Sequence, residues 1–479
     1  PSPFMLEVNN ETAGYAQLEI GRTEFDLTSM LKADYNTIAV RIYKNAATNK
    51  IEDHRQHNDL RFRDAFMLAQ PRIRVRDITA STLVEPDGRG ILSMGVIMAS
   101  AMRNPYEYTV HYELIDREGK VASSGSREFT TSWFSEDTLR FATTLPGVKP
   151  WNHETPNLYT LVVRSFHEGR NVEFVTAKIG FRNISYSNGS VLLNGRQVKL
   201  APSEAAYLSN ERRSESELRK LQKSGINCVI VKGNPQPDYF YSICDRIGMY
   251  VCDMTDIDTS KQPREITVGG NPSNDPDWAA AYVERAMDMY YSSRLHPSVV
   301  MFSPAGNAGN GYPLYESYLA LKGVEKDRPI VYLDAGGQWN NDPVSFVDTA
   351  SPGRVSAAIH KKGSGNVAIN VRNSYDLTTA EGYVVYTINQ GNKARAVYHE
   401  PIAVAPGKSA EVEVPSDRLG LVPKNASVEV FVYTKNHAPG YNATSEPTKG
   451  PDPSKIKNGG TLPDLSDMGI ADTASLQLD

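Results

Sequence analysis

Strands and helices alternate through the middle of the chain, and this alternation restricts the fold more than any other feature. From residue 191 onward, apolar segments of strand length are followed by segments with helical spacing. The predicted strands cover residues 228–231, 249–252, 299–302 and 330–333. The intervening helices cover residues 214–223, 239–248 and 277–291. Such repeats predict a parallel sheet covered by helices, equivalent to the first half of a (β/α) barrel, in which functional sites lie at the C-terminal ends of the strands.

The segments on both sides of this region are predicted to be β-structure. Residues 37–43, 106–114 and 158–163 are apolar or alternate over strand length and are rich in β-branched and aromatic side chains. Turn-forming clusters at 85–90 and 116–120 separate such strands, as is typical of β-sandwiches. After residue 355 a second alternating pattern begins, so the half-barrel is followed directly by another sandwich.

A series of motifs occurs in the order and at about the spacing of glycoside hydrolase family 2, the β-galactosidase family, which the chain therefore resembles. Leu6–Tyr15 and Asn36–Ile42 resemble strands of that family's jelly-roll domain, and Ile51–His54 with Phe62–Leu68 resembles its exit. The remaining matches are Pro150–Leu161, Gly180–Arg182, Val191–Gly195, Leu221–Cys228, Cys244–Val251 and the strand introduced by His296.

The resemblance implies a multidomain β plus α/β protein. The expected order is a jelly-roll-like sandwich, an immunoglobulin-like sandwich, a truncated (β/α) TIM-type barrel and a second immunoglobulin-like sandwich. The expected boundaries are a partial jelly-roll, sugar-binding-type domain over residues 1–76, then 77–185, 186–350 and 351–443, with an extended or disordered tail over 444–479. The tail is rich in Pro, Gly, Asp and Ser, a composition that disfavours a packed core.

The catalytic acid of the family is absent from this sequence. The resemblance places the general acid/base Glu after Gly306 and Asn307, where this chain has Ala308. A methyl group neither donates nor accepts a proton, whereas a retaining glycosidase needs two carboxyl groups about 5 Å apart. The strand bearing the family's nucleophilic Glu falls in the missing half of the barrel. The family's metal-binding and sugar-binding side chains are also replaced, for example at Ala201–Ala206 and in Glu52–Arg55, where Arg55 replaces a sugar-contacting carboxylate.

Three features remain as candidates for binding or chemistry. Asp253, Asp256 and Asp258 follow a strand, where carboxylates suit a cation or acid–base work, although a solvated acidic loop or a helix cap accounts for them equally. Asn307 is retained beside Ala308, and Tyr312 and Trp339 follow it; aromatic faces stack on sugars, and they also pack in loops. His296 and Pro297 are expected to shape the entry to the strand without transferring protons.

Composition excludes several other classes of function. The net charge is −5 without a basic cluster, so nucleic acid is not an expected partner. No apolar run approaches the ~20 residues of a transmembrane segment. Cys228, Cys244 and Cys252 are odd in number and are expected to be buried free thiols. No phosphate loop, metal set or nucleophile elbow is present, so no cofactor or metal is expected.

These observations predict a family 2 homologue that has lost its catalytic carboxylates and acts as a carbohydrate-binding or structural and assembly subunit. Two alternatives remain open: an active glycoside hydrolase cleaving β-galactosides or related glycosides, and a subunit whose barrel is completed by a partner chain. Open strand edges in the half-barrel and the N-terminal part-domain favour a protein partner or homo-oligomer. The resemblance favours a periplasmic, cell-surface or extracellular location.

Overall fold

A computed structural model describes most of the chain, and its contacts divide it into two units. Unit 1 comprises Pro1–Trp151, Asn157–Glu217 and Asn227–Asp348, and unit 2 comprises Asn152–Pro156, Leu218–Ile226 and Thr349–Asp479. The described residues are 3–16, 23–43, 46–52, 65–205, 210–231, 236–264, 267–335, 340–348, 350, 353–363, 366–391, 393–419, 425–435, 451, 458–459, 461–466 and 468–478.

The N-terminal part of unit 1 is a small antiparallel sheet. Its strands are β1 (Phe4–Val8), β2 (Glu11–Ala16) and β3 (Ile38–Ile42), in the order β2-β1-β3. Asn9 and Asn10 both have positive φ, the conformation of the two-residue turns that match strand twist. The 3-10 helix η1 (Ala47–Ile51) then leads toward the barrel. The described part of the expected jelly-roll region is therefore one sheet, and its domain boundary stays a prediction.

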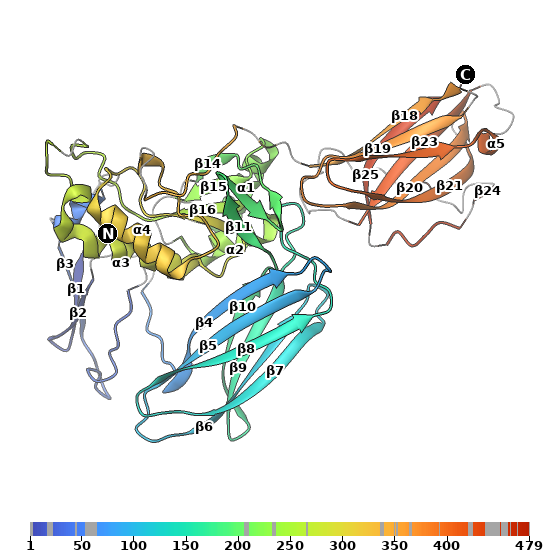
Figure 1. Cartoon of the computed structure of the whole chain (residues 1–479). Helices are drawn as coiled ribbons and strands as arrows, with labels where there is room; N and C mark the ends of the chain where they lie inside the picture. The colour runs from blue at the N-terminus through green and yellow to red at the C-terminus, as the bar shows by residue number, and fades with distance from the viewer. Residues whose placement is uncertain are drawn as a thin grey trace. The chain divides into compact units, whose positions relative to one another are not determined.

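The next part of unit 1 is a β-sandwich, as the alternating pattern predicted (Figure 1). Its two sheets have the orders β4-β5-β8 and β10-β9-β6-β7. Side chains from both sheets, including Val96, Val110 and Leu161, form one buried core. The strands are β4 (Ile73–Val84), β5 (Gly90–Ser100), β6 (Glu107–Ile115), β7 (Val121–Thr130), β8 (Glu136–Leu145), β9 (Tyr159–His167) and β10 (Arg170–Ile179).

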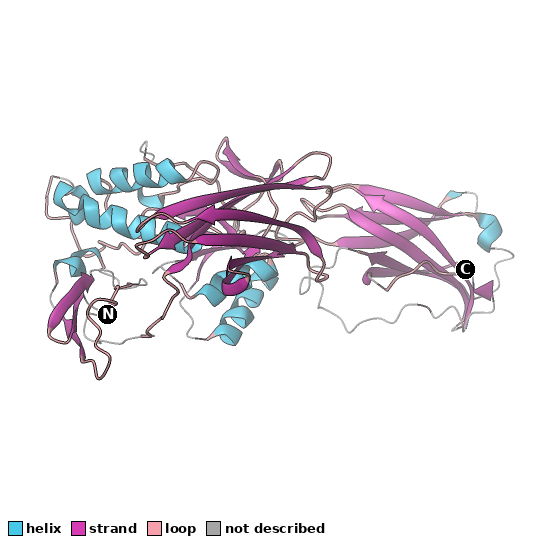
Figure 2. Ribbon diagram, turned by 90° about the horizontal axis from the view of Figure 1, so that it is seen from below, coloured by secondary structure: helices cyan, strands magenta, loops and turns pink. Residues whose placement is uncertain are grey.

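The part-barrel is a parallel sheet of the order β14-β15-β16-β17, with helices packed around it (Figure 2). A small sheet of β11 (Ile184–Ser187), β12 (Ser190–Leu193) and β13 (Arg196–Gln197) precedes it. The strands of the parallel sheet are β14 (Pro202–Ala205), β15 (Cys228–Val231), β16 (Tyr250–Met254) and β17 (Val299–Ser303). Its helices are α1 (Glu211–Lys223), α2 (Asp238–Ile247), α3 (Ala279–Ser293) and α4 (Tyr312–Val324), with the short 3-10 turns η2 (Pro272–Asn274), η3 (Pro276–Trp278) and η4 (Leu333–Ala335).

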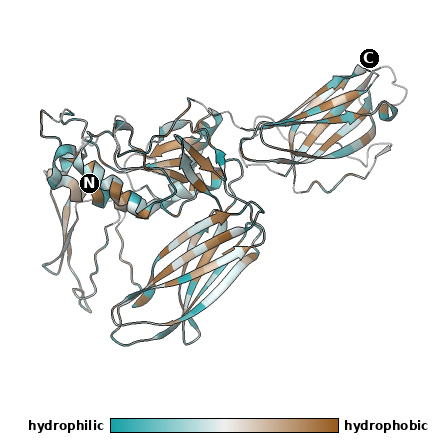
Figure 3. Cartoon of the chain, in the orientation of Figure 1, coloured by the Kyte–Doolittle hydropathy of each residue, from teal (hydrophilic) through white to brown (hydrophobic). Residues whose placement is uncertain are grey.

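Every residue of β15, β16 and β17 is buried, so these strands are covered on both faces. This burial explains why their sequences are largely apolar, as the brown colouring of the parallel sheet in Figure 3 shows. The prediction that Cys228, Cys244 and Cys252 are buried free thiols is confirmed. Burial raises the pKa of Cys228 to about 12, so this thiol stays protonated at neutral pH.

The predicted strand 330–333 does not form as expected. Ile330 makes a single parallel bridge with Phe302 at the edge of β17, and the chain then turns into η4. Farther along, Phe346 makes a parallel bridge with Leu200, just before β14 at the opposite edge. The backbone amides of Val331 and Val347 donate to Phe302 and Leu200 over 2.7 and 2.9 Å. The segment between them therefore reaches both open edges of the four-stranded sheet.

Two residues of the family-like motifs lie at the N-terminal end of the parallel sheet. The indole Nε1 of Trp151 donates to the carbonyl of Asp245 over 2.9 Å, and the ring is completely buried. The guanidinium of Arg182 donates to the carbonyls of Pro297 and Val299, where β17 begins. These motif residues join the preceding sandwich to the sheet.

Unit 2 is the second β-sandwich. Its sheets have the orders β18-β19-β22 and β24-β21-β20-β23-β25, around a core that includes Ile369, Tyr386 and Val430. The elements are β18 (Val355–Lys361), β19 (Val367–Asn373), β20 (Ala380–Gln390), β21 (Lys393–Val404), β22 (Ser409–Val414), α5 (Ser416–Leu419), β23 (Ala426–Thr434), β24 (Asn458–Gly459) and β25 (Gly469–Gln477).

The last part of the tail, which was predicted to be extended or disordered, forms a β-strand. Strand β25 pairs with β23 in antiparallel register, and Ala474, Leu476 and Leu478 pack against the core of unit 2. The two-residue alternation of these small and apolar side chains was masked by the polar composition of the tail as a whole. Among the described helices, none is long and apolar enough to cross a bilayer.

The pairing of β25 predicts that a charge on its inner face destabilises unit 2. Leu476→Asp places a carboxylate against the core and should lower the free energy of unfolding by about 2 kcal/mol. Ser475→Asp, one residue away on the exposed face, should change it by less than about 0.5 kcal/mol. Urea unfolding of both variants measures this difference, and equal midpoints would contradict the structural role of β25.

Candidate functional site

Ala308 lies in the loop that follows β17, at the C-terminal end of the sheet. Its side chain is 1% exposed and belongs to an apolar cluster with Ile51, Leu314 and Tyr332. Ile51 comes from the exit of the N-terminal region, and the backbone amide of Asp258 donates to its carbonyl over 2.8 Å. Ala308, to which the motif resemblance assigns the family's acid position, is thus part of a small hydrophobic core.

Hydrogen bonds hold the backbone of this loop. The amide of Thr259 donates to the carbonyl of Asn307 over 3.0 Å. The hydroxyl of Tyr332 lies 2.8 and 2.7 Å from the carbonyl oxygens of Ala308 and Gly309. Burial raises the pKa of Tyr332 well above its usual range, so this hydroxyl keeps its proton. The loop conformation is therefore fixed by residues from two separate segments.

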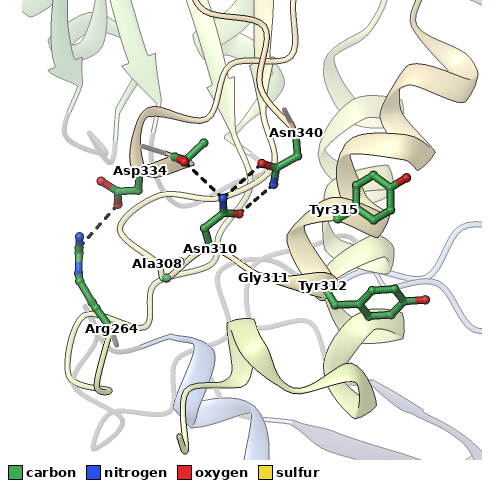
Figure 4. A pocket seen from close by; sticks show the side chains of 10 residues that line it. Arg264, Ala308, Asn310, Gly311, Tyr312, Tyr315, Asp334 and Asn340 are labelled. Atoms are coloured by element: carbon green, nitrogen blue, oxygen red, sulfur yellow. Dashed lines mark hydrogen bonds and ion pairs between the residues drawn. The ribbon is translucent and has the colours of Figure 1, made fainter. Parts of the chain in front are cut away.

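A cleft of about 480 Å³ opens beside Ala308. Figure 4 shows Arg264 and Asp334 on one side and Tyr312 and Tyr315 on the helix at the other side, with Ala308 and Asn310 between them. The lining residues are Arg264, Ala308, Gly309, Asn310, Gly311, Tyr312, Tyr315, Asp334, Ala335 and Asn340.

The polar side chains of the cleft are paired with one another. Arg264 lies 3.6 Å from a carboxylate oxygen of Asp334 and also donates to the side-chain oxygen of Asn307. The amides of Asn310 and Asn340 exchange two hydrogen bonds of 3.2 and 2.8 Å. Asp334 is the single carboxylate among the lining residues that the structure describes.

The predicted acidic residues lie outside this cleft. Asp253 is fully buried in β16, with both carboxylate oxygens 3.0 Å from the hydroxyl of Tyr241. Asp256 is also buried, and Asp258 accepts a hydrogen bond from the amide of Ser260, which is a local turn contact. Within the described ranges, no group of three or more acidic, His or Cys side chains could hold a metal ion. A binding role for the three aspartates stays a prediction.

The other residues predicted to contact a ligand are Asn307, Tyr312 and Trp339. The side-chain oxygen of Asn307 accepts a hydrogen bond from Arg264, as described above. Tyr312 lines the rim of the cleft, half exposed, with its ring pointing away from Ala308 (Figure 4). Trp339 lies outside the described residues. Of the three, Tyr312 is the one that the structure assigns to the cleft.

The acidic residue of the jelly-roll exit has a structural partner. Glu52 is 1% exposed, and its carboxylate lies 2.8 Å from the guanidinium of Arg285 on α3. Glu52 also forms a parallel bridge with Asp258. These contacts anchor the N-terminal exit against the barrel helices. Arg55 lies outside the described residues.

His296 contacts two buried residues at the entry to β17. Its Nδ1 lies 2.6 Å from Asp245, and its ring stacks on Tyr241 with centroids 5.0 Å apart. The other oxygen of Asp245 accepts the amide of Ser298 over 2.9 Å. Burial of His296 opposes its protonation, but the carboxylate of Asp245 outweighs this effect and raises the pKa of His296.

Sequence reasoning missed five cleft residues, which are Arg264, Asn310, Tyr315, Asp334 and Asn340. Arg264 lies in a loop with no motif, and Asp334 and Asn340 lie beyond residues 330–333, the segment predicted as a strand. Asn310 offered a local signal, because it follows Ala308 within the same glycine-rich loop.

Comparison with known proteins agrees with this architecture. The family model "Glycosyl hydrolases family 2, TIM barrel domain" matches residues 209–353, and "Glycosyl hydrolases family 2" matches residues 73–182. Together the two ranges cover more than half of the chain. This chain belongs to glycoside hydrolase family 2. The resemblance drawn from the sequence motifs is therefore confirmed, as is the multidomain fold class.

Relatives within family 2 are considerably longer. A β-galactosidase of Vibrio vulnificus strain CMCP6 is 29% identical over 356 residues, which is 70% of this chain and 33% of that protein. The chain thus spans about a third of the length of this curated relative.

Solved family 2 structures share the fold at low sequence identity. A Bacteroides uniformis β-glucuronidase superposes with a TM-score of 0.57 at 12% identity, covering 90% of this chain and 69% of that one. A family 2 member from Bacteroides cellulosilyticus gives a TM-score of 0.55 at 14% identity, covering 91% and 72%.

The pair of His296 and Asp245 predicts a pH-dependent contribution to stability. Because the folded-state pKa of His296 is raised above its unfolded value, this contribution is complete below about pH 6.5 and is lost as pH rises through the folded pKa. Urea midpoints of the full chain should therefore fall from pH 6 to pH 9 more steeply than those of His296→Gln. The exposed His360 supplies a control, and His360→Gln should keep the wild-type slope. Identical slopes in all three proteins would exclude the ion pair as the cause.

Proposed function

We propose that this chain is a non-hydrolytic member of family 2, whose barrel-mouth cleft holds a saccharide as part of a binding or assembly role. The observation that carries the proposal is Ala308, whose buried methyl group stands where a family 2 enzyme presents its acid/base carboxyl.

The composition of the cleft also supports the absence of a retaining mechanism. That mechanism places two carboxyl groups about 5–5.5 Å apart, one as acid/base and one as nucleophile. The described lining offers Asp334 alone, and Arg264 lies beside it. One carboxylate cannot act as both the acid/base and the nucleophile. The described residues of the cleft therefore do not supply the pair of carboxyl groups that the mechanism needs.

Binding remains compatible with the same residues. Sugar sites combine apolar or aromatic walls with a few polar groups that fix orientation. Here Tyr312 and Tyr315 lie on one side, and the amides of Asn310 and Asn340 supply donors and acceptors. Arg264 adds a cation that is half exposed and able to meet a hydroxyl or carboxylate of a ligand. This combination supports a saccharide as the ligand class.

The two alternatives make different demands on the structure. An active glycoside hydrolase would have to rely on Asp334 or on residues outside the described ranges. A barrel completed by a partner chain would need both edges of the sheet to be free for pairing. Ile330 and Phe346 lie against those edges, so this alternative requires their displacement.

The proposal predicts binding without turnover. The purified protein should not hydrolyse nitrophenyl β-galactoside, β-glucuronide or β-mannoside above the buffer rate, because no carboxyl pair is available. Calorimetry with uncleaved methyl β-glycosides should detect binding that Arg264→Ala weakens by about tenfold, the effect of one lost charged hydrogen bond.

A matched variant distinguishes real turnover from contamination. Hydrolysis that survives repurification and disappears in Asp334→Asn would establish an active enzyme and refute the proposal. Tyr291→Ala alters an exposed aromatic residue that does not line the cleft, and it should leave both assays unchanged.

Restoring the acid alone should fail. Ala308→Glu buries a carboxyl among Leu314, Tyr332 and Ile51, so its pKa should rise and the free energy of unfolding should fall by about 2–4 kcal/mol. No glycosidase activity should appear, because the nucleophile is missing. Ala308→Leu separates the effect of size from that of charge in the same unfolding assay. Activity gained by Ala308→Glu would demonstrate a second catalytic carboxylate.

A further inference from the structure

The larger sheet of unit 2 carries an apolar cluster on its outer face, away from the core of the sandwich. Val385 on β20, Val397 on β21 and Phe431 on β23 are buried there. They alternate along their strands with core residues such as Val384 and Val430. In a sandwich the outward side chains are ordinarily polar, because only the inner faces are covered. The burial of this outer cluster therefore requires a further layer outside the sheet.

Part of the tail supplies this layer. Leu462 and Leu465, which lie between β24 and β25, pack against the outer cluster. We call residues 461–466 the strap. Within it, the amide of Ser466 donates to the side chain of Asp464 over 3.0 Å, which is a local turn contact. Apolar contact of the two leucines thus attaches the strap to the sheet.

Three polar atoms on the same outer face have no hydrogen-bond partner among the described residues. They are Oγ1 of Thr387, Oδ1 of Asn389 and Nδ1 of His399. Thr387 and Asn389 follow Val385 at two-residue spacing on β20, and His399 pairs with Val385 from β21. Thr387 is 1% exposed and Asn389 is 7% exposed, and all three atoms are closed off from solvent. Water therefore has no access to these atoms while the face is covered.

Covering this face has two opposing effects on free energy. Burial of Leu462 and Leu465 against the cluster favours the closed arrangement, in proportion to the apolar area removed from water. Removal of water from the three polar atoms, without new hydrogen bonds in its place, opposes that arrangement. An unpaired buried polar atom offsets much of what one partly buried leucine contributes. The strap is thus held less firmly than the strands beneath it.

Strand β25, which follows the strap, is attached in a different way. It pairs with β23 from Ser427 to Thr434 in antiparallel register. Ala474 and Leu476 of β25 pack against the core of the sandwich. Opening of the strap therefore leaves β25 and the two sheets in place.

We propose that the strap is a displaceable cover, which opens while the sandwich of unit 2 stays folded. In the open state the three polar atoms regain hydrogen bonds to water, and the rings of Tyr383, Phe431 and Tyr433 become accessible. Access to this face of the sheet is consequently controlled by the tail of the same chain. The inference concerns unit 2 alone, and it does not depend on saccharide binding in the cleft beside Ala308.

Labelling of an introduced cysteine in the full chain measures the opening. Val397→Cys places a thiol in the outer cluster, and Val430→Cys places one in the core of the same sandwich. The three native thiols are buried, and peptide mass spectrometry separates them from the new one. Under native conditions Val397→Cys should react at least about a hundredfold faster than Val430→Cys, because only the latter requires unfolding of the sandwich. Urea should accelerate the reaction of Val430→Cys steeply and that of Val397→Cys only slightly.

Further substitutions in the Val397→Cys background test the cause of the opening. Thr387→Val keeps the shape of the side chain and removes its unpaired hydroxyl, so labelling should slow by about tenfold. Thr434→Val is the matched control, because its hydroxyl is also buried and unpaired among the described residues but lies on the inner face of β23. This control should leave the labelling rate unchanged. Leu465→Ala removes an apolar anchor and should accelerate labelling by about tenfold.

Three results would refute the displaceable cover. Equal labelling rates of Val397→Cys and Val430→Cys would show that the strap leaves only when the sandwich unfolds. Labelling of Val397→Cys as fast as that of a cysteine in an unfolded peptide would show that the strap does not cover the cluster. Equal slowing by Thr387→Val and Thr434→Val would assign the opening to the whole sandwich instead of the strap.

Discussion

The fold of the barrel region depends on how the two edges of a four-stranded parallel sheet are covered. A complete barrel has no edges, because its last strand pairs with its first. Four strands leave backbone donors and acceptors unpaired on both sides, and such edges invite association with other chains. Here the segment after α4 contacts β17 near Ile330 and contacts the start of β14 near Phe346. One connection thus reaches both edges, although it pairs each of them over a short length.

The packing beside β17 limits which side chains this region can accept. Apolar side chains fill the space, with Ile51, Ala308 and Tyr332 packed in one cluster. This environment favours a methyl group at position 308 and would penalise a carboxylate there.

The sequence predicted regular elements better than it predicted their contacts. Strands β15, β16 and β17 were recognisable because burial on both faces makes most of their residues apolar. Residues 330–333 form a similar apolar run, but they pair with β17 through a single bridge at Ile330. The length of this pairing depends on where the chain continues, because it turns into η4. Strand β25 was missed because its inward residues are few and its segment is polar on average. The cleft residues Arg264, Asp334 and Asn340 meet only through tertiary structure, so no local pattern identifies them.

The two ends of the parallel sheet have been retained to different extents. In (β/α) barrels, the N-terminal ends of the strands contribute to stability and the C-terminal ends carry function. This chain keeps the family-like residues at the first end, where Trp151 and Arg182 bind backbone carbonyls and His296 pairs with Asp245. At the second end, the acid is replaced by Ala308 and the cleft is lined by paired polar groups. Selection for a folded scaffold explains the first set without requiring the second.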